Sequence, residues 1–132
     1  MVYPIQLNSN SHMRVILASA VRFLYDNIIE SVEEHKENRS RLSGAILAHC
    51  MGLGKSLSTI SFIHTMLMHK ETGLGIKTCL ILCPVNTLLN WHREWRHWMP
   101  ENAEVNVFEL ATAVANNFRV DVIRHWHSEV NV

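Results

Sequence analysis

Apolar residues recur at three- and four-residue intervals in four stretches of the chain, a pattern typical of helices with one buried face. The stretches lie within residues 13–37, from Ser56 to His69, from Thr87 onward, and from Phe118 to Trp126. The residues expected to be buried are Val21, Leu24, Tyr25, Ile28 and Val32; Leu57, Ile60, Ile63 and Leu67; Leu88, Trp91, Trp95 and Trp98; and Phe118, Val122, Ile123 and Trp126. The pattern therefore predicts four helices.

Short apolar runs of strand length precede the last three of these helices. They cover residues 44–48, 77–83 and 105–110, and Pro84 ends the second one. Strands that alternate with helices, without hairpin turns between them, favour a parallel sheet, because parallel neighbours need crossover connections. The predicted fold class is α/β, with a parallel sheet flanked by helices. Residues 1–12 are polar and without a period, and we expect them to be a disordered lead-in.

Composition excludes several classes of protein. The chain has 132 residues, 48% of them hydrophobic, and its 12 basic and 12 acidic side chains cancel. This describes one globular domain or less, and it leaves no general charge argument for nucleic acid. The longest apolar stretches, such as 79–83, are much shorter than the roughly 20 residues of a membrane span, so no membrane partner is expected.

Cysteine spacing argues against a metal centre. Cys79 and Cys83 are four residues apart on an expected strand, which places them about 13 Å apart, too far to share one ion. We expect both to be core thiols and predict no structural zinc in this segment.

The strongest chemical signal lies at residues 48–56, between the first apolar run and the following helix. The sequence Gly-Leu-Gly-Lys-Ser at 52–56 suits a phosphate-binding loop, in which successive backbone amides face an anion. Lys55 would reach the β- and γ-phosphates of a nucleotide, and the hydroxyl of Ser56 would complete the shell of a Mg²⁺ ion. The full pattern has Gly where this chain has His49. The alternative is a chance turn with Lys55 solvated.

The motifs of this chain resemble those of a known family. Residues 51–56, Met-Gly-Leu-Gly-Lys-Ser, resemble the Met-Gly-Leu-Gly-Lys-Thr signature of Swi/Snf-type chromatin-remodelling ATPases, which are helicase-like DNA translocases. Ala-His-Cys at 48–50 is similar to the ATRX branch of that family, and residues 83–91 resemble the family's next motif. The resemblance covers roughly residues 21–126.

The resemblance implies that residues 13–132 form an incomplete first ATP-binding lobe, a partial RecA-like P-loop NTPase lobe. ATP and Mg²⁺ are the implied cofactors, double-stranded DNA and nucleosomes the implied partners, and the nucleus the implied location. The residues implied to hold the ATP phosphates are Gly52, Leu53, Gly54, Lys55 and Ser56, with Ser56 also binding Mg²⁺. Asn86 and Thr87, in the motif at 83–91, are implied to contact a DNA phosphate, and the alternative is a simple helix cap.

Two departures from the family pattern bear on activity. Val15, Leu17 and Ala20 stand where the family's adenine motif has Pro, Gln and Gly, so the adenine edge has no hydrogen-bonding partner there. The Asp-Glu-x-His motif, which holds Mg²⁺ and orients the attacking water, does not follow, and neither does the second lobe. We therefore assign no catalytic residue and expect this chain alone to be inactive as an ATP hydrolase.

Two other classes of function stay open. A self-contained small P-loop nucleotide-binding protein or phosphotransferase would need an acidic Mg²⁺ ligand, for which Glu109 and Asp121 are the late candidates. A non-enzymatic remnant that binds a partner is the other possibility.

Overall fold

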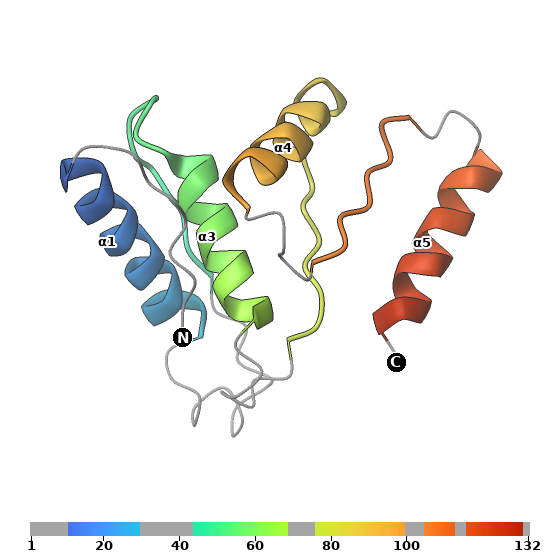
Figure 1. Ribbon diagram of the computed structural model, residues 1–132, viewed down its shortest axis with the longest axis horizontal. Helices are drawn as coiled ribbons and strands as arrows, with labels where there is room; N and C mark the ends of the chain where they lie inside the picture. Colours follow the sequence, from blue (N-terminus) through green and yellow to red (C-terminus); the bar gives the residue numbers. More distant parts are fainter. Residues whose placement is uncertain (1–10, 30–43, 69–75, 100–104, 113–115, 131–132) are drawn as a thin grey trace. The chain divides into compact units, whose positions relative to one another are not determined.

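The computed structural model describes residues 11–29, 44–68, 76–99, 105–112 and 116–130. Within them lie four helices, α1 (Ser11–Ile28), α3 (Lys55–Met68), α4 (Val85–Trp98) and α5 (Asn116–Val130) (Figure 1). The chain divides into two compact units, Met1–Ile76 and Lys77–Val132. The first unit holds α1 and α3, and the second holds α4 and α5.

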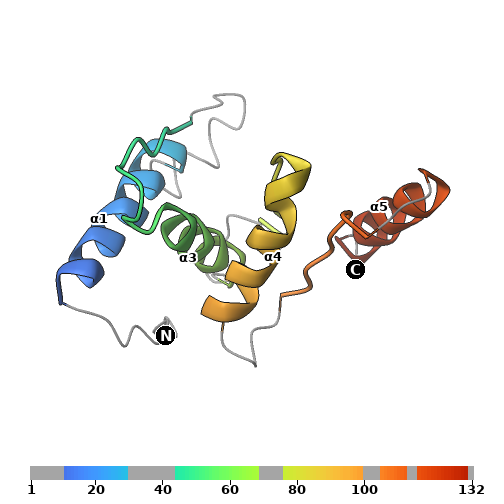
Figure 2. The same ribbon diagram turned by 90° about the horizontal axis from the view of Figure 1, so that it is seen from above.

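In the first unit α1 and α3 pack side by side, as Figures 1 and 2 both show. Ile60 of α3 is completely buried, with an exposed fraction of 0%, and Leu24 and Ala20 of α1 are buried as well. Burial of apolar side chains between the two helices is the main stabilising contribution in this unit. The predicted faces of the first two helices are confirmed where they are described, and Val32 lies outside the described residues.

Helix α3 is buried nearly all round, although it contains several hydroxyl side chains. Thr59, Ser61 and Thr65 donate to the carbonyl oxygens of the residues four positions earlier, at 2.9, 2.7 and 2.7 Å. These bonds satisfy polar groups that would otherwise be costly to bury.

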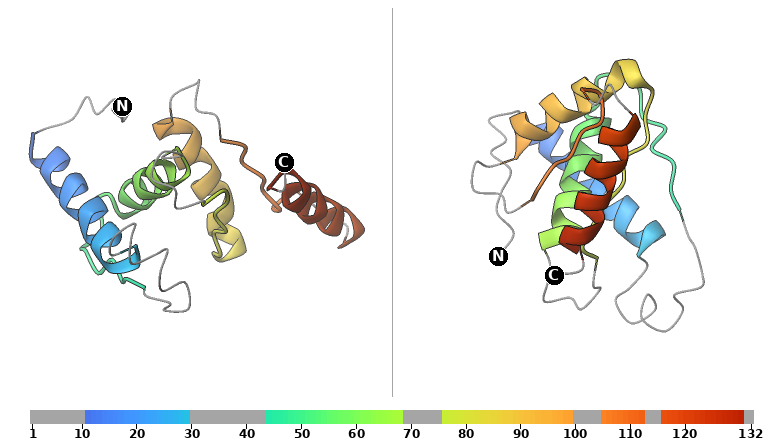
Figure 3. Two further views of the ribbon diagram at one scale, coloured as in Figure 1. Left: turned by 90° about the horizontal axis from the view of Figure 1, so that it is seen from below. Right: turned by 90° about the vertical axis from the view of Figure 1, so that its right-hand side faces the viewer.

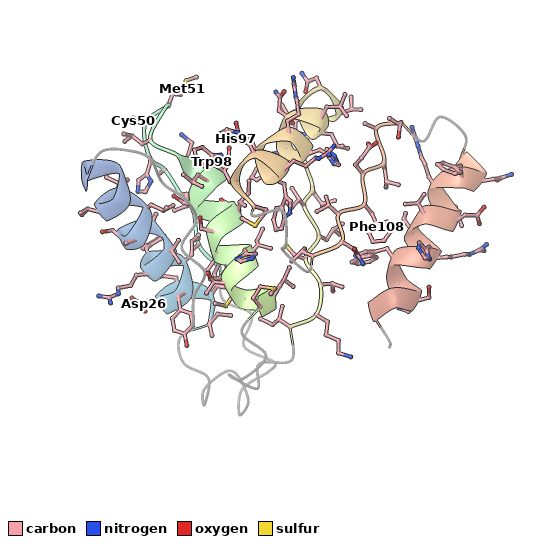
Figure 4. All side chains as sticks on the ribbon, in the orientation of Figure 1. Asp26, Cys50, Met51, His97, Trp98 and Phe108 are labelled. Atoms are coloured by element: carbon pink, nitrogen blue, oxygen red, sulfur yellow. The ribbon has the colours of Figure 1, made fainter. Side chains whose placement is uncertain are left out.

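In the second unit, the extended segment 77–84 leads directly into α4 (Figure 3). Trp95 is buried, and Leu88, Trp91 and Trp98 are half-buried, so the predicted buried face of this helix is confirmed. The ring of Phe108 in segment 105–110 meets the ring of His125 on α5 edge to face, with centroids 5.6 Å apart (Figure 4).

The fourth predicted helix is present, but its predicted face is not a buried one. Val122 and Trp126 are half-buried, whereas Phe118 and Ile123 are exposed. The three- and four-residue spacing of apolar residues thus located the helix. It did not show how much of the apolar face would be buried against other residues.

The predicted parallel sheet is wrong. Among the described residues there is no strand, and the segments expected to form one, 44–48, 77–83 and 105–110, are extended without pairing into a ladder. Their side chains are correspondingly open, with exposed fractions of 85% for Ile46 and 86% for Leu82. A strand is completed by hydrogen bonds from a neighbour, and a short apolar run carries no information about that neighbour. The described residues therefore do not form the α/β sheet architecture that the sequence pattern predicted.

Smaller expectations also need revision. Cys79 is exposed and Cys83 half-buried, so neither is the core thiol that the sequence suggested. Residues 1–10 of the expected lead-in lie outside the described residues, and Ser11 already begins α1. No helix in the described part of the chain is long and apolar enough to cross a membrane.

Candidate phosphate-binding loop and helix α4

The backbone of the loop before α3 turns at two glycines. Gly52 has φ +85° and Gly54 has φ +72°. L-residues with a side chain enter this left-handed region at a cost of about 1–2 kcal/mol, whereas glycine enters it freely. The amide of Leu53 also donates to the carbonyl oxygen of Cys50 at 3.5 Å, a long bond that closes the turn. The predicted loop glycines therefore occupy the two positions where the chain needs them.

The first backbone amides of α3 are open to a ligand. Among the described residues, the amides of Lys55, Ser56 and Leu57 have no backbone acceptor, and the amide of Ser58 is the first to bond back, to Gly54 O at 2.8 Å. Unpaired amides at a helix N-terminus, together with the positive end of the helix dipole, form a site for an anion. This arrangement fits a phosphate group.

The side chain of Lys55 folds back over the loop. Its Nζ donates to the carbonyl oxygens of His49 at 2.8 Å and Cys50 at 3.0 Å. An ammonium group has three donors, so one remains for another acceptor. The residue that departs from the full phosphate-loop pattern, His49, takes part through its main chain. Because every residue type has that carbonyl, the missing glycine does not disturb this contact.

The rim of the loop is exposed. Cys50 and Met51 lie at its tip (Figure 4), and the exposed fraction of Met51 is 95%. Leu53 is also exposed, and Ser56 is half-buried at the start of α3. A side-chain methyl group at Gly52 would meet open space, so the glycine is required by its φ angle and not by crowding.

The second predicted site lies at the start of α4. Thr87 donates from its hydroxyl and from its amide to the carbonyl oxygen of Pro84, at 2.8 and 2.9 Å. Pro84 occupies the N-cap position, with no capping hydrogen bond from a side chain. The helix-cap alternative for Thr87 is therefore wrong, because a capping hydroxyl accepts from an amide and this one donates to a carbonyl. Asn86 is exposed next to it.

Helix α4 also carries side-chain pairs that sequence reasoning did not single out. Arg93 donates from Nη2 to Oδ1 of Asn90 and from Nε to the carbonyl oxygen of Leu89 at 3.3 Å. The indole nitrogen of Trp98 donates to a carboxylate oxygen of Glu94 at 2.7 Å. Spacings of three and four residues on an expected helix were the available signal for these contacts.

The two candidate acidic Mg²⁺ ligands, Glu109 and Asp121, form contacts within their own segments. The carboxylate of Glu109 accepts from the Thr112 hydroxyl at 2.7 Å and from the Ala111 amide at 2.6 Å, and the Thr112 bond is the main reason that the pKa of Glu109 lies below its ordinary value. Asp121 forms an exposed ion pair with Arg124 at 3.5 Å. No group of three or more His, Cys, Asp or Glu side chains suited to a metal ion occurs among the described residues.

Two of the three positions that depart from the family's adenine motif have a packing role. Leu17 and Ala20 are buried on α1, and Val15 is exposed. Apolar residues at the two buried positions contribute to the core of the first unit in place of a polar contact.

Comparison with known proteins relates these features to a family. The family described as "SNF2-related domain" matches residues 12–132, which include the three positions on α1. The chain is 36% identical over 132 residues to the Transcriptional regulator ATRX homolog of Caenorhabditis elegans, covering 95% of this chain and 9% of that protein. It is 41% identical over 115 residues to Transcriptional regulator ATRX of Mus musculus, covering 85% and 4%, respectively.

A plant protein matches to a similar degree. The chain is 36% identical over 124 residues to Protein CHROMATIN REMODELING 20 of Arabidopsis thaliana, covering 93% of this chain and 8% of that protein. The chain therefore spans less than a tenth of the length of these curated relatives. No solved structure gives a significant match.

Proposed function

Because the chain belongs to the SNF2-related domain family, we propose that its 52–56 loop binds the phosphates of ATP as part of an ATP-dependent chromatin remodeller. The observation that carries this proposal is the combination of two left-handed glycines with three open amides at the start of α3. Open amides occur at any helix start, so the two glycines at positive φ directly before them are the specific part of this combination. The loop at 48–56 then belongs to a helicase-like ATP-binding lobe that extends over residues 13–132.

The donor set at the loop fits a nucleotide phosphate. The open amides of Lys55, Ser56 and Leu57 supply neutral donors, and Lys55 also supplies a positive charge whose third N–H is available. The hydroxyl of Ser56 is of the type that completes the shell of Mg²⁺. When bound, Mg²⁺ neutralises charge on the β- and γ-phosphates.

Contact with double-stranded DNA is proposed for the start of α4. Asn86 is exposed, and the N-terminal end of the helix favours a phosphate group. Thr87 uses its hydroxyl proton on Pro84, so a phosphate would be held by the side-chain amide of Asn86 and by backbone amides rather than by that proton. DNA and nucleosomes are accordingly the proposed partners, and the nucleus is the proposed location.

The names of the relatives refer to transcription regulation and chromatin remodelling. Translocation along DNA, ATP hydrolysis and nucleosome remodelling are therefore proposed for the whole protein. Within this chain the proposed roles are binding roles, and no residue is assigned to catalysis.

Equilibrium binding of a fluorescent ATP analogue in the presence of Mg²⁺ tests the proposal. Lys55→Ala is expected to weaken binding by about tenfold or more, because a charge-assisted contact to phosphate contributes about 1.5–3 kcal/mol. Lys77→Ala, which removes the same charge from an exposed position, is the matched control and should bind as the unchanged protein does. Equal affinities of the Lys55→Ala variant and the unchanged protein would contradict the assignment.

A further inference from the structure

The exposed face of α4 carries a row of polar side chains, Asn86, Asn90, Arg93 and His97, which we call the polar strip. All four residues are exposed, and Asn90, Arg93 and His97 also line a surface depression. At 100° and 1.5 Å per residue, the four positions fall within about 60° of the helix circumference and extend over about 16 Å. They lie opposite the side that buries Trp95.

Hydrogen bonds orient the middle of the strip. Arg93 donates to Asn90 Oδ1 and to the carbonyl oxygen of Leu89, and both acceptors lie one turn toward the start of the helix. The guanidinium group therefore extends toward the end that carries Asn86. Since Asn90 uses Oδ1 for Arg93, its Nδ2 group is left to donate outward, and Arg93 retains three further N–H donors.

The neighbouring acidic residue is held by a hydrogen bond within the helix. Glu94 also lines the depression, but its carboxylate accepts from the indole nitrogen of Trp98, one turn toward the C-terminal end of the helix. The part of the strip from Asn86 to Arg93 thus combines outward donors, one full positive charge and the positive end of the helix dipole.

We propose that Asn90 and Arg93 bind the sugar–phosphate backbone of double-stranded DNA, one to two turns beyond the contact at Asn86 and Thr87. This inference rests on the proposed function of the start of α4. A surface that offers donors and positive charge suits phosphate oxygens, which only accept hydrogen bonds. Backbone contacts of this kind position the duplex without reading its sequence, so the contact should be independent of base composition.

Fluorescence anisotropy of a labelled duplex, titrated with the 132-residue chain at several salt concentrations, tests this surface. Arg93→Ala is expected to weaken binding about fivefold or more and to reduce the slope of log affinity against log salt by about 0.9, the value for one phosphate contact. Arg96→Ala removes the same charge from an exposed position on α4 outside the strip and should change neither quantity appreciably. If both arginine variants weaken binding equally, the loss reflects the lower net charge of the chain. The proposed DNA contact of the polar strip is then wrong.

A second variant separates contact from folding. Asn90→Asp keeps an acceptor for Arg93 but replaces the outward donor by a negative charge, so it should weaken DNA binding while the circular dichroism spectrum stays unchanged. Binding equal to that of the unchanged protein would overturn the role of Asn90. If the double variant Asn86→Ala, Thr87→Ala weakens binding and the two strip variants do not, the strip is wrong and the contact at the helix start stands. If the unchanged chain does not bind the duplex, both proposals fail.

Discussion

The ammonium group of Lys55 lies 2.8 Å from the carbonyl oxygen of His49, so this lysine bridges the loop that precedes its own helix. A second bond of 3.0 Å to the carbonyl oxygen of Cys50 strengthens the bridge. The loop is therefore held in its conformation by a side chain proposed to bind phosphate, as well as by its two glycines.

Removal of this bridge should loosen the loop. Lys55→Ala deletes both hydrogen bonds, each worth about 1 kcal/mol, so the amides of residues 50–54 should exchange with solvent deuterium about fivefold faster or more. Hydrogen-exchange mass spectrometry measures this directly. Lys55→Arg retains donors of the same charge and should restore part of the protection. Identical exchange in Lys55→Ala and the unchanged protein would show that the bridge does not hold the loop.

The left-handed backbone at Gly52 should be necessary for nucleotide binding. Gly52→Ala meets no steric obstacle but must adopt φ +85° or shift the loop, at a cost of about 1–2 kcal/mol. If the loop shifts, its amides lose their common direction, and we expect affinity for an ATP analogue to fall about five- to thirtyfold. Gly44→Ala is the control, because a methyl group there also meets open space, without the positive φ. Equal affinities of the two variants would mean that this angle is irrelevant.

Stability should fall with decreasing pH because of His64. Burial on α3 lowers the pKa of His64 below its ordinary value of 6.5, so the unfolded chain takes up a proton at a higher pH than the folded chain does. The free energy of unfolding is then highest above 6.5 and decreases as the pH falls from there toward the lowered pKa. Urea denaturation at a series of pH values tests this. His64→Gln should remove this part of the pH dependence. If the free energy of unfolding of that variant changes with pH as it does in the unchanged protein, His64 is not the cause.

Packing of α3 should depend strongly on Ile60. Its side chain is completely buried, so Ile60→Ala should lower the free energy of unfolding by about 2–5 kcal/mol, through lost apolar contact and the cavity left behind. Ile46→Ala makes the same chemical change at an exposed position and should alter stability by less than about 0.5 kcal/mol. Denaturant titration, monitored by circular dichroism, compares the two variants. Similar losses of unfolding free energy would contradict the burial of Ile60 in the core.

Local order was readable from the sequence. The spacing of Leu57, Ile60 and Ile63 located a helix and its buried face, because helical periodicity places such residues on one side whatever they pack against. The glycines at 52 and 54 and Lys55 were likewise identified from residue type and spacing. Their roles follow from local physics, since only glycine enters the left-handed region freely and a helix start leaves amides unpaired wherever it occurs.

Relations between distant or flexible groups required the tertiary structure. The sequence predicted strands at 44–48, 77–83 and 105–110, but hydrogen-bonded partners make a strand, and the described residues pair none of them. The sequence also could not show that Lys55 bonds to two loop carbonyls, or that Arg93 turns toward Asn90, since long side chains have many rotamers of similar energy. The sequence by itself thus determined the helices, the loop and the family, whereas the tertiary structure decided that the apolar segments form no ladder in the described residues, and where the charged side chains point.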